Sequence, residues 1–314
     1  MKVLITGGTG LVGKAIQKVA NQLYTDTSKF EFVFLSSKDC NLLKKEEVEK
    51  VWDKENPDLV IHLAANVGGL FKNMNFKVDM FEGNVLMNFN VLQVSHQKNV
   101  NNVVCCLSTC IFPDKTTYPI NEEMLHNGPP HFSNDAYAYA KRMLEIHCQA
   151  YREQYGRNYR CVIPTNIYGP WDNFNLEDAH VIPALIHRCY LAKQNDEDFT
   201  VRGTGKPLRQ FIFSNDLAYY ILWYSLNYEG TETIILANEA EYPIGEIALE
   251  VAKNFGWEDR LVFQPEFADG QFKKTADASL LMEKCNDKID FTTIGDGIKQ
   301  SVDWFIQNYK IARK

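Results

Sequence analysis

The sequence predicts a doubly wound α/β protein: a parallel sheet covered by helices on both faces, joined to a smaller α/β domain. Three observations predict it. Short apolar strands without polar alternation recur through the first 165 residues, separated by segments of helical periodicity. A glycine-rich turn directly follows the first of these strands. After Pro164 the regular alternation of strand and helix loosens into longer loops.

The elements follow from runs of apolar residues and from the stops between them. We expect strands at 2–6, 31–36, 59–63, 103–107 and 159–163, and helices at 10–22, 44–54, 85–98 and 136–155. Further helices are expected at 180–193, 214–227, 244–255 and 296–309, and strands at 210–213 and 233–237 rejoin the sheet. We therefore assign 1–164 to a dinucleotide-binding domain to which 210–238 returns. Residues 165–209 and 239–314 form the substrate-binding domain.

Composition narrows the functional class. The 314 residues are 45% hydrophobic and 23% charged, with a net charge of −7, which argues against a general nucleic-acid surface. No apolar run approaches the roughly 18 residues of a membrane span. Met1 leads directly into a strand rather than a signal peptide. The eight cysteines show neither paired CxxC spacing nor a metal pattern with histidine. We expect a cytoplasmic protein without a metal.

The glycine-rich turn indicates a dinucleotide site. Glycines at 7, 8, 10 and 13 lie between the first strand and the first helix. They allow a tight turn and close approach of a pyrophosphate, which the free N–H groups of the helix N-terminus can bind. The alternative is a plain strand-to-helix turn, but the position at the first strand favours a Rossmann-type cofactor site. The expected contacts here are Gly7, Gly10, Leu11, Val12 and Gly13.

The end of the second strand favours NADP(H) over NAD. An acidic residue about 20 positions beyond the glycines would bind a free ribose 2′-hydroxyl. Here Ser36, Ser37 and Lys38 offer two hydroxyls and an ammonium, which suit a 2′-phosphate. Asp39 lies close enough to keep NAD open. Small residues after the third strand would let the cofactor lie near the backbone, at Leu63, Ala64 and Ala65.

Tyr137 and Lys141 are four residues apart in a predicted helix and so share one face. A nearby ammonium favours phenolate, so we expect Lys141 to lower the pKa of Tyr137. Ser108 follows the fourth strand, where it could bind the same substrate oxygen. Such a trio can polarise a carbonyl and protonate an alkoxide. An ordinary amphipathic helix is the alternative for the spacing by itself, and Tyr139 competes with Tyr137 in the same segment.

Two further residues suggest proton transfer at carbon. Cys110 lies two residues past Ser108, at the expected ligand crevice, where a thiolate could remove a proton beside a ketone. The alternative is a packed thiol. His180 opens a helix after a polar loop and could act as the complementary acid, although a single histidine is often merely structural. Arg209, in a glycine-rich loop, could bind a diphosphate or be a surface charge.

These segments resemble the GDP-L-fucose synthase family of extended short-chain dehydrogenases/reductases. The resemblance rests on LSTCIFP at 107–113, YAYAKR at 137–142, PTNIYGP at 164–170, DNFN at 172–175, HVIP at 180–183, RQF at 209–211 and DGQFKKT at 269–275. It implies GDP-4-keto-6-deoxy-mannose as substrate, NADPH as reductant, and Cys110 and His180 as the pair that epimerises C3 and C5. Ser108, Tyr137 and Lys141 would support the enolate and hydride delivery to C4.

The resemblance also implies binding residues and assembly. Pro164, Asn166, Ile167 and His180 would contact the cofactor. Substrate contacts are implied at Asn166, Arg188, Arg202, Arg209, Asp269 and Lys274. A homodimer joined through the helices at 85–98 and 136–155 is implied as well. Arg202 stands where the family usually has tryptophan, and two arginines that bind the 2′-phosphate in bacterial members are missing near Thr9 and Lys38.

Several rival functions remain. Another nucleotide-linked keto-sugar epimerase/reductase is one, and a simple 4-epimerase, which needs no pair such as Cys110 and His180, is a second. A nucleotide-sugar 4,6-dehydratase would need an acidic pair after the fourth strand, where this sequence has Ser108, Thr109 and Cys110. An inactive NADP-binding sensor would predict damage to the glycine turn or to the Tyr137–Lys141 pair, and both are intact.

Overall fold

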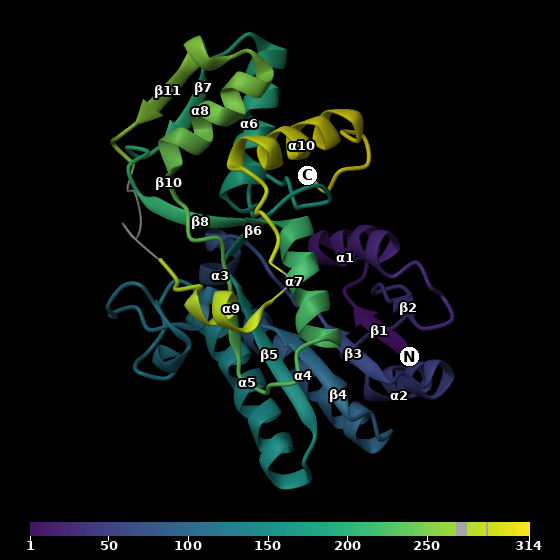
Figure 1. Ribbon diagram of the computed structural model, residues 1–314. Coiled ribbons are helices and arrows are strands. Elements are labelled where there is room, and N and C mark those ends of the chain that lie inside the picture. The colour runs from purple at the N-terminus through teal and green to yellow at the C-terminus, as the bar shows by residue number, and fades with distance from the viewer. Residues whose placement is uncertain (268–274, 287) are drawn as a thin grey trace.

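The core of the protein is a six-stranded parallel sheet. The computed structural model describes residues 1–267, 275–286 and 288–314 (Figure 1). The strands lie in the order β2-β1-β3-β4-β5-β9. Their bounds are β1 Lys2–Thr6, β2 Glu31–Phe34, β3 Leu59–His62, β4 Asn102–Cys106, β5 Asn158–Pro164 and β9 Ile234–Leu236. The strand order reverses between β1 and β3, and in open α/β sheets ligands bind beyond the carboxyl ends of the strands at such a point.

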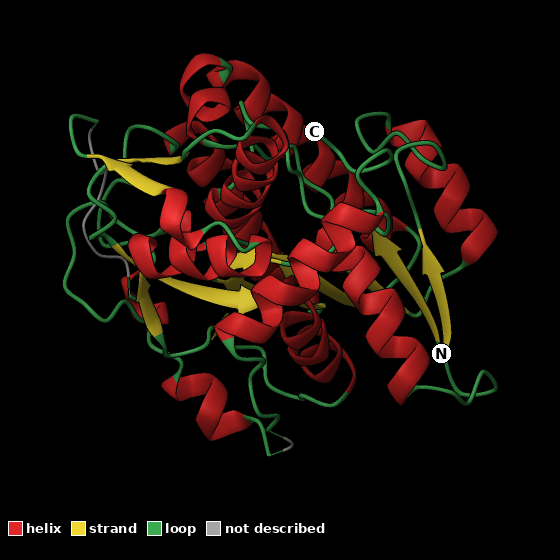
Figure 2. Ribbon diagram, turned by 90° about the horizontal axis from the view of Figure 1, so that it is seen from above, coloured by secondary structure: helices red, strands yellow, loops and turns green. Residues whose placement is uncertain are grey.

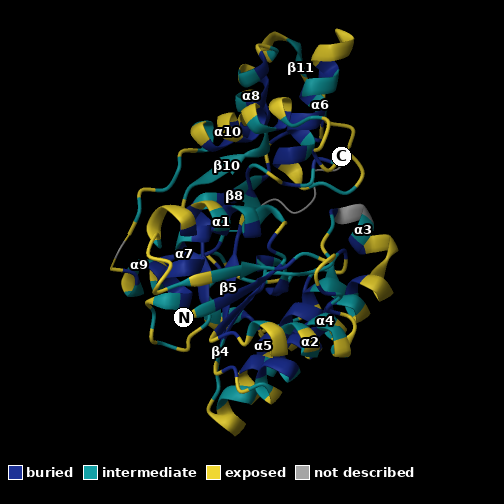
Figure 3. Ribbon diagram, turned by 90° about the vertical axis from the view of Figure 1, so that its right-hand side faces the viewer, coloured by how far each residue is buried: buried dark blue, intermediate teal, exposed yellow. Residues whose placement is uncertain are grey.

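Helices cover both faces of this sheet, as the view from above shows (Figure 2). On one face lie α2 (Lys45–Glu55), α4 (Lys77–Gln97) and α5 (Asp135–Tyr155). On the other lie α1 (Leu11–Leu23) and α7 (Ser214–Leu226). Because strands such as VLI at 3–5 send alternate side chains to the two faces, both faces are apolar and each packs its own core. The buried strands lie inside a shell of helices whose outer surfaces are exposed (Figure 3).

A second, smaller region lies over the carboxyl ends of the strands (Figure 1). It contains a three-stranded sheet, β10-β8-β6, and a parallel pair, β11-β7, with a third apolar core. The bounds are β6 Asn166–Tyr168, β7 Phe199–Arg202, β8 Leu208–Phe213, β10 Glu241–Pro243, β11 Leu261–Gln264, α6 Val181–Asn195, α8 Ile244–Phe255 and α10 Ile294–Gln307. The short helices are α3 (Leu70–Asn75) and α9 (Ser279–Lys284), with 3₁₀ turns at Thr109–Ile111, Glu122–Met124 and Glu258–Arg260.

The parallel α/β fold predicted from the sequence is confirmed, with one error in the sheet. The segment at 233–237 does rejoin the large sheet, where β9 pairs with β5. The strand expected at 210–213 does not: β8 pairs with β6 and β10 in the smaller sheet. An apolar run predicts a strand but not its partners, which tertiary packing selects. The domain boundaries stay a prediction. None of the described helices has both the length and the apolar character needed to cross a bilayer.

Candidate active site

A cavity of about 1210 Å³ lies at the carboxyl ends of the large sheet. It is lined by the glycine turn after β1, the segment after β3, the end of β4, the start of α5 and residues of the smaller region. The loop after β3 meets that region directly, since the Gly69 N–H donates to the carbonyl of Asp178 at 2.7 Å. The cavity therefore gathers segments that are more than 100 residues apart in the chain. Among the described residues, no three His, Cys, Asp or Glu side chains are arranged to hold a metal ion.

The glycine turn fits a dinucleotide. Gly7 has φ of +70°, and a Cβ there would lie 2.9 Å from the backbone nitrogen of Ala64. At Gly13 a Cβ would lie 2.4 Å from the carbonyl oxygen of Gly7. Helix α1 begins after Gly10 with no side-chain cap, which leaves its first N–H groups available to an anion. The turn thus keeps the backbone close-packed and open toward a phosphate. The residues expected here from the sequence all line the cavity: Gly7, Gly10, Leu11, Val12 and Gly13.

We expect Gly13→Ala to weaken NADPH binding by about fivefold to a hundredfold, because relieving overpacking by backbone shifts costs about 1–3 kcal/mol. Both atoms nearest to the added methyl group belong to the backbone of the glycine turn, so the turn itself must move. Fluorescence titration with NADPH measures the change. Gly295→Ala in α10 is the matched control, since its nearest neighbour would lie 3.5 Å away. Equal affinity in the two variants would contradict this role for the turn.

The turn after β2 is organised by Asp39. Its Oδ2 accepts from the backbone N–H of Ser36 at 2.8 Å and from the Ser36 hydroxyl at 2.6 Å. The Ser36 hydroxyl oxygen in turn accepts from the Lys38 N–H at 3.2 Å. Ser36 and Ser37 line the cavity, as predicted, but Lys38 is not among its lining residues. Asp39, whose carboxylate left NAD as an alternative cofactor, therefore holds the turn through hydrogen bonds to Ser36. The lining continues through residues 40–43, which we did not predict.

The sides of the cavity also hold the remaining residues predicted to contact the cofactor. Leu63, Ala64 and Ala65 line it after β3, and Pro164, Asn166 and Ile167 line it between β5 and β6. The Asn166 side chain donates from Nδ2 to the carbonyl of Gln210 at 2.8 Å, which ties β6 to β8. The cavity thus runs from the glycine turn to the junction of the two regions.

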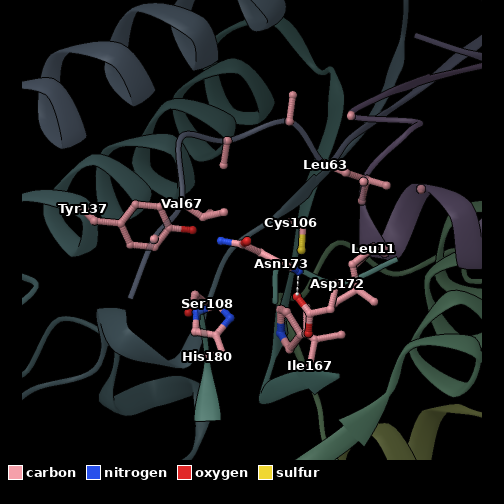
Figure 4. A pocket seen from close by; sticks show the side chains of 18 of the residues that line it. Leu11, Leu63, Val67, Cys106, Ser108, Tyr137, Ile167, Asp172, Asn173 and His180 are labelled. Atoms are coloured by element: carbon pink, nitrogen blue, oxygen red, sulfur yellow. Dashed lines mark hydrogen bonds between the residues drawn. The ribbon is translucent and has the colours of Figure 1, made fainter. Parts of the chain in front are cut away.

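Ser108, Tyr137 and Lys141 line one cavity with the glycine turn. Lys141 is 1% exposed, and its Nζ donates to the carbonyl of Cys106 at 2.7 Å. The same Nζ lies 5.8 Å from the centre of the Tyr137 ring. The hydroxyl end of Tyr137 points into the space that Ser108 also lines (Figure 4). Tyr139, the competing residue, is 42% exposed and is not among the lining residues.

The expectation that Lys141 lowers the pKa of Tyr137 is wrong for this arrangement. Burial raises the pKa of Tyr137 well above its usual value, and a thiolate at Cys110 or Cys106 would raise it further. Burial also lowers the pKa of Lys141. Desolvation outweighs the ammonium because Lys141 is held on a backbone carbonyl rather than against the phenol oxygen. At neutral pH the phenol keeps its proton and is equipped to donate it.

Cys110 and His180 complete the predicted group. Cys110 is half-buried in the turn Thr109–Ile111, where its N–H donates to the Ser108 hydroxyl oxygen at 3.4 Å. His180 precedes the first turn of α6 and is open to the cavity. Although its surface meets the cavity, the surrounding protein lowers its pKa, so the ring is neutral at pH 7. Ser108 and His180 are both among the lining residues labelled in Figure 4.

The predicted substrate contacts are divided. Arg209 lines the cavity, with Nη1 donating to the carbonyl of Leu208 at 2.7 Å. Arg188 and Arg202 are not among its lining residues. Burial lowers the pKa of Arg188, and the nearby positive charge of Arg202 lowers it further. The guanidinium of Arg202 also lies over the Phe267 ring. Asp269 and Lys274 lie outside the described residues.

Asp172 is a cavity residue that the sequence analysis quoted only within a motif. It is 5% exposed, and its Oδ1 accepts from the Asn173 N–H at 2.7 Å. Its buried Oδ2 has no hydrogen-bond partner among the described residues. Burial raises the pKa of this carboxyl to about 7. The segment is held between Lys14, whose Nζ lies 5.0 Å from the Trp171 ring, and Arg313, which donates to the Trp171 carbonyl. No local pattern in the sequence signals this burial.

We expect Asp172→Asn to stabilise the ligand-free protein at pH 8 but not at pH 4. The folded-state pKa of about 7 exceeds the usual aspartate value of 3.8, so the native state binds a proton more tightly than the unfolded chain. The stability of the parent therefore falls as pH rises from about 4 to 7, by up to about 4 kcal/mol. Urea unfolding at both pH values measures this difference. An equal gain at both pH values, or an equal gain for the exposed control Asp259→Asn, would contradict it.

A glycine turn at the first strand of a doubly wound parallel sheet defines a Rossmann-type dinucleotide-binding protein. The sequence pattern of the "NAD dependent epimerase/dehydratase family" matches residues 3–237. GDP-L-fucose synthase of Dictyostelium discoideum is 51% identical, covering 99% of this chain and 97% of the relative. The probable GDP-L-fucose synthase of Drosophila melanogaster is 48% identical over 100% and 99%. The chain belongs to this epimerase/dehydratase family and, within it, to the GDP-L-fucose synthases.

A solved structure gives the same result. The crystal structure of a GDP-L-fucose synthetase from Naegleria fowleri bound to NADP has a TM-score of 0.94 and 46% sequence identity. The match covers 100% of this chain and 95% of that one. Similarity at this level extends across both the large sheet and the smaller region.

Proposed function

We propose that this protein makes GDP-L-fucose from GDP-4-keto-6-deoxy-D-mannose by epimerising C3 and C5 and reducing C4 with NADPH. The observation that carries the proposal is the joint lining of one cavity by the glycine turn, the Ser108–Tyr137–Lys141 group, Cys110 and His180. The names of the full-length relatives and the NADP-bound structure support the same substrate and cofactor. A cavity of about 1210 Å³ has room for a sugar beside a dinucleotide.

The epimerisation uses acidity created by the C4 ketone. Removal of the proton at C3 or C5 gives an enolate, whose oxygen Ser108 and Tyr137 can stabilise by hydrogen bonds. Cys110 and His180 serve as the proton-transferring pair, one removing a proton from the carbon and the other returning one to the opposite face. The lowered pKa of His180 favours its neutral ring. The pair therefore holds one proton between its two members: a neutral His180 can remove a proton while the Cys110 thiol supplies one, or, once the thiol proton has passed to His180, the Cys110 thiolate can remove a proton while the imidazolium supplies one.

The reduction uses the cofactor-binding residues of the same cavity together with Tyr137. The glycine turn would hold the pyrophosphate of NADPH, Ser36 and Ser37 would face the adenosine ribose, and Lys141 would face the nicotinamide ribose. When bound, NADPH supplies the hydride that C4 receives. Tyr137 donates its phenolic proton to the oxygen at C4, and its raised pKa ensures that this proton is present.

One experiment separates this function from its rivals. Incubating the protein with GDP-4-keto-6-deoxymannose in deuterated water, followed by NMR, should show deuterium at C3 and C5 and, with NADPH, GDP-L-fucose as product. NADPH oxidation without deuterium uptake would indicate a simple reductase. Cofactor binding with neither reaction would indicate the sensor. A 4,6-dehydratase remains disfavoured, because the segment at 108–110 contains no carboxylate.

We further propose a homodimer joined through α4 and α5, which pack on one another. Exposed apolar side chains on these helices support this arrangement: Leu86, Phe89, Met143 and Ile146 are 44–49% exposed. A cytoplasmic location is supported by the eight free cysteines, since a reducing compartment would keep thiols such as Cys105 and Cys148 unbonded, with sulfurs 3.8 Å apart.

A further inference from the structure

The segment that carries Ser108 and Cys110 is braced at both ends by two adjacent cations of α5. Lys141 donates to the carbonyl of Cys106, just before the segment. Arg142 donates from Nε to the carbonyl of Ile111 at 2.6 Å, just after it. The proposed function accounts for Lys141 but leaves Arg142 unused.

Arg142 is a buried arginine that links two backbone segments, not a charge on the protein surface. It is 8% exposed, and its Nη1 donates to the carbonyl of Gly128 at 2.7 Å. One guanidinium thus joins the turn of Cys110 to the loop at Gly128. Its rigid fork suits two carbonyls at once, which the single ammonium of a lysine cannot match in geometry.

The charge of Arg142 is not neutralised by a carboxylate. The carboxylate of Glu145, one turn further along α5, is paired with His126 rather than with Arg142. Among the described residues the buried Nη2 of Arg142 has no hydrogen-bond partner. Its only aromatic contact there is with the Tyr139 ring, 5.7 Å from Cζ. A buried positive charge that no carboxylate balances stabilises negative charge on neighbouring groups. A thiol beside an arginine therefore loses its proton more readily than a free thiol does.

Burial lowers the pKa of Arg142, while two ionisable groups, Tyr139 and then Cys110, raise it, and of the two only Cys110 lines the cavity. The attraction between the guanidinium and a thiolate at Cys110 acts on both groups, so the charge of Arg142 favours the thiolate over the thiol. Other groups act on Cys110 too. Lys141 adds a second positive charge from α5, while Tyr137 and, from β4, Cys106 add none at neutral pH. His180, which lines the same cavity, is neutral at pH 7.

We propose that Arg142 is a positioning residue, which fixes the Cys110 turn by its two carbonyl bonds and favours the thiolate of Cys110 by its charge. The importance of this thiolate for the reaction rests on the proposed function. The effect of Arg142 on the ionisation of Cys110 does not rest on the proposed function. The role of the thiolate in the reaction and the effect of Arg142 on the thiol can therefore be tested separately.

The test is the pH dependence of Cys110 alkylation by iodoacetamide, read by mass spectrometry. The other seven cysteines are buried, and fragmentation of the labelled peptide separates Cys110 from Cys106, which also lines the cavity. Arg142→Gln keeps a donor but removes the charge, and should raise the midpoint of the alkylation profile by about one pH unit, or about tenfold slower labelling at pH 7. Arg142→Lys keeps the charge but loses the fork. Its midpoint should stay near that of the parent while deuterium uptake at C3 and C5 slows.

Arg152→Gln is the matched control, because Arg152 lies on the same helix and makes the same kind of bond, from Nη1 to the Tyr159 carbonyl. An Arg142→Gln profile that coincides with this control would overturn the proposal. If Arg142→Gln does not fold, Arg142→Lys decides: unchanged deuterium uptake would overturn the positioning role. If Cys110→Ser still exchanged the protons at C3 and C5, the proposed function of Cys110 would fail while the alkylation result stood.

Discussion

Replacing Tyr137 with phenylalanine is expected to slow C4 reduction by about two to four orders of magnitude, because it removes a positioned proton donor. NADPH binding should change little, since the ring and its packing remain. The prediction depends on the phenol being protonated, which follows from the burial that raises its pKa. Stopped-flow measurement of NADPH oxidation with saturating keto-sugar gives the rate directly.

Tyr139→Phe provides the control for this variant. Tyr139 lies on the same helix and differs by the same hydroxyl, but it is 42% exposed. It should reduce the substrate at the parental rate. A Tyr137→Phe protein with that same rate would mean that another group delivers the proton to C4. The raised pKa also implies that activity should not fall at mildly acidic pH through loss of a Tyr137 phenolate.

Replacing Cys110 with serine is expected to suppress deuterium uptake at C3 and C5 by about a hundredfold or more, as removal of a positioned base does. A serine hydroxyl at this position is far less acidic than a thiol. Reduction at C4 should persist on the unepimerised sugar, because Tyr137 and Lys141 are unchanged. Product NMR separates the two reactions.

Cys189→Ser is the comparison for this variant, since Cys189 is buried in α6, within the separate core of the smaller region. Its epimerisation rate per folded molecule should match the parent. Normal formation of GDP-L-fucose by Cys110→Ser would exclude the thiol as the required base.

The large sheet could be predicted because its signals are local. The structure of apolar runs such as LVI at 59–61, and of the glycine turn, follows from their local sequence. The predicted bounds of helix 244–255 agree with the structure at both ends. The smaller region was harder. Strands such as β6 and β10 have three residues each, too few for any periodicity, and their pairing with β8 depends on segments far along the chain.

The chemical groups of the site could also be predicted from local sequence signals. Their protonation states could not, because these depend on burial in the folded protein. Ser108, Tyr137 and His180 are recognisable by position after a strand or within a helix. The protonation of Tyr137 depends on burial, and the role of Arg142 depends on a carbonyl 31 residues away. Helix α4 begins eight residues before its predicted start, because the segment 77–84 lacks a clear apolar stripe but packs against neighbouring elements.

The pairing of β9 with β5 has a consequence for how the chain is made. About 70 residues, including α6 and three strands of the smaller region, separate β5 from the strand that covers its outer side. During synthesis, β5 is an edge strand with unpaired backbone N–H and C=O groups until β9 emerges from the ribosome. Such an edge can pair with other chains and promote aggregation. We therefore expect nascent chains that end between residues 165 and 233 to expose this strand edge.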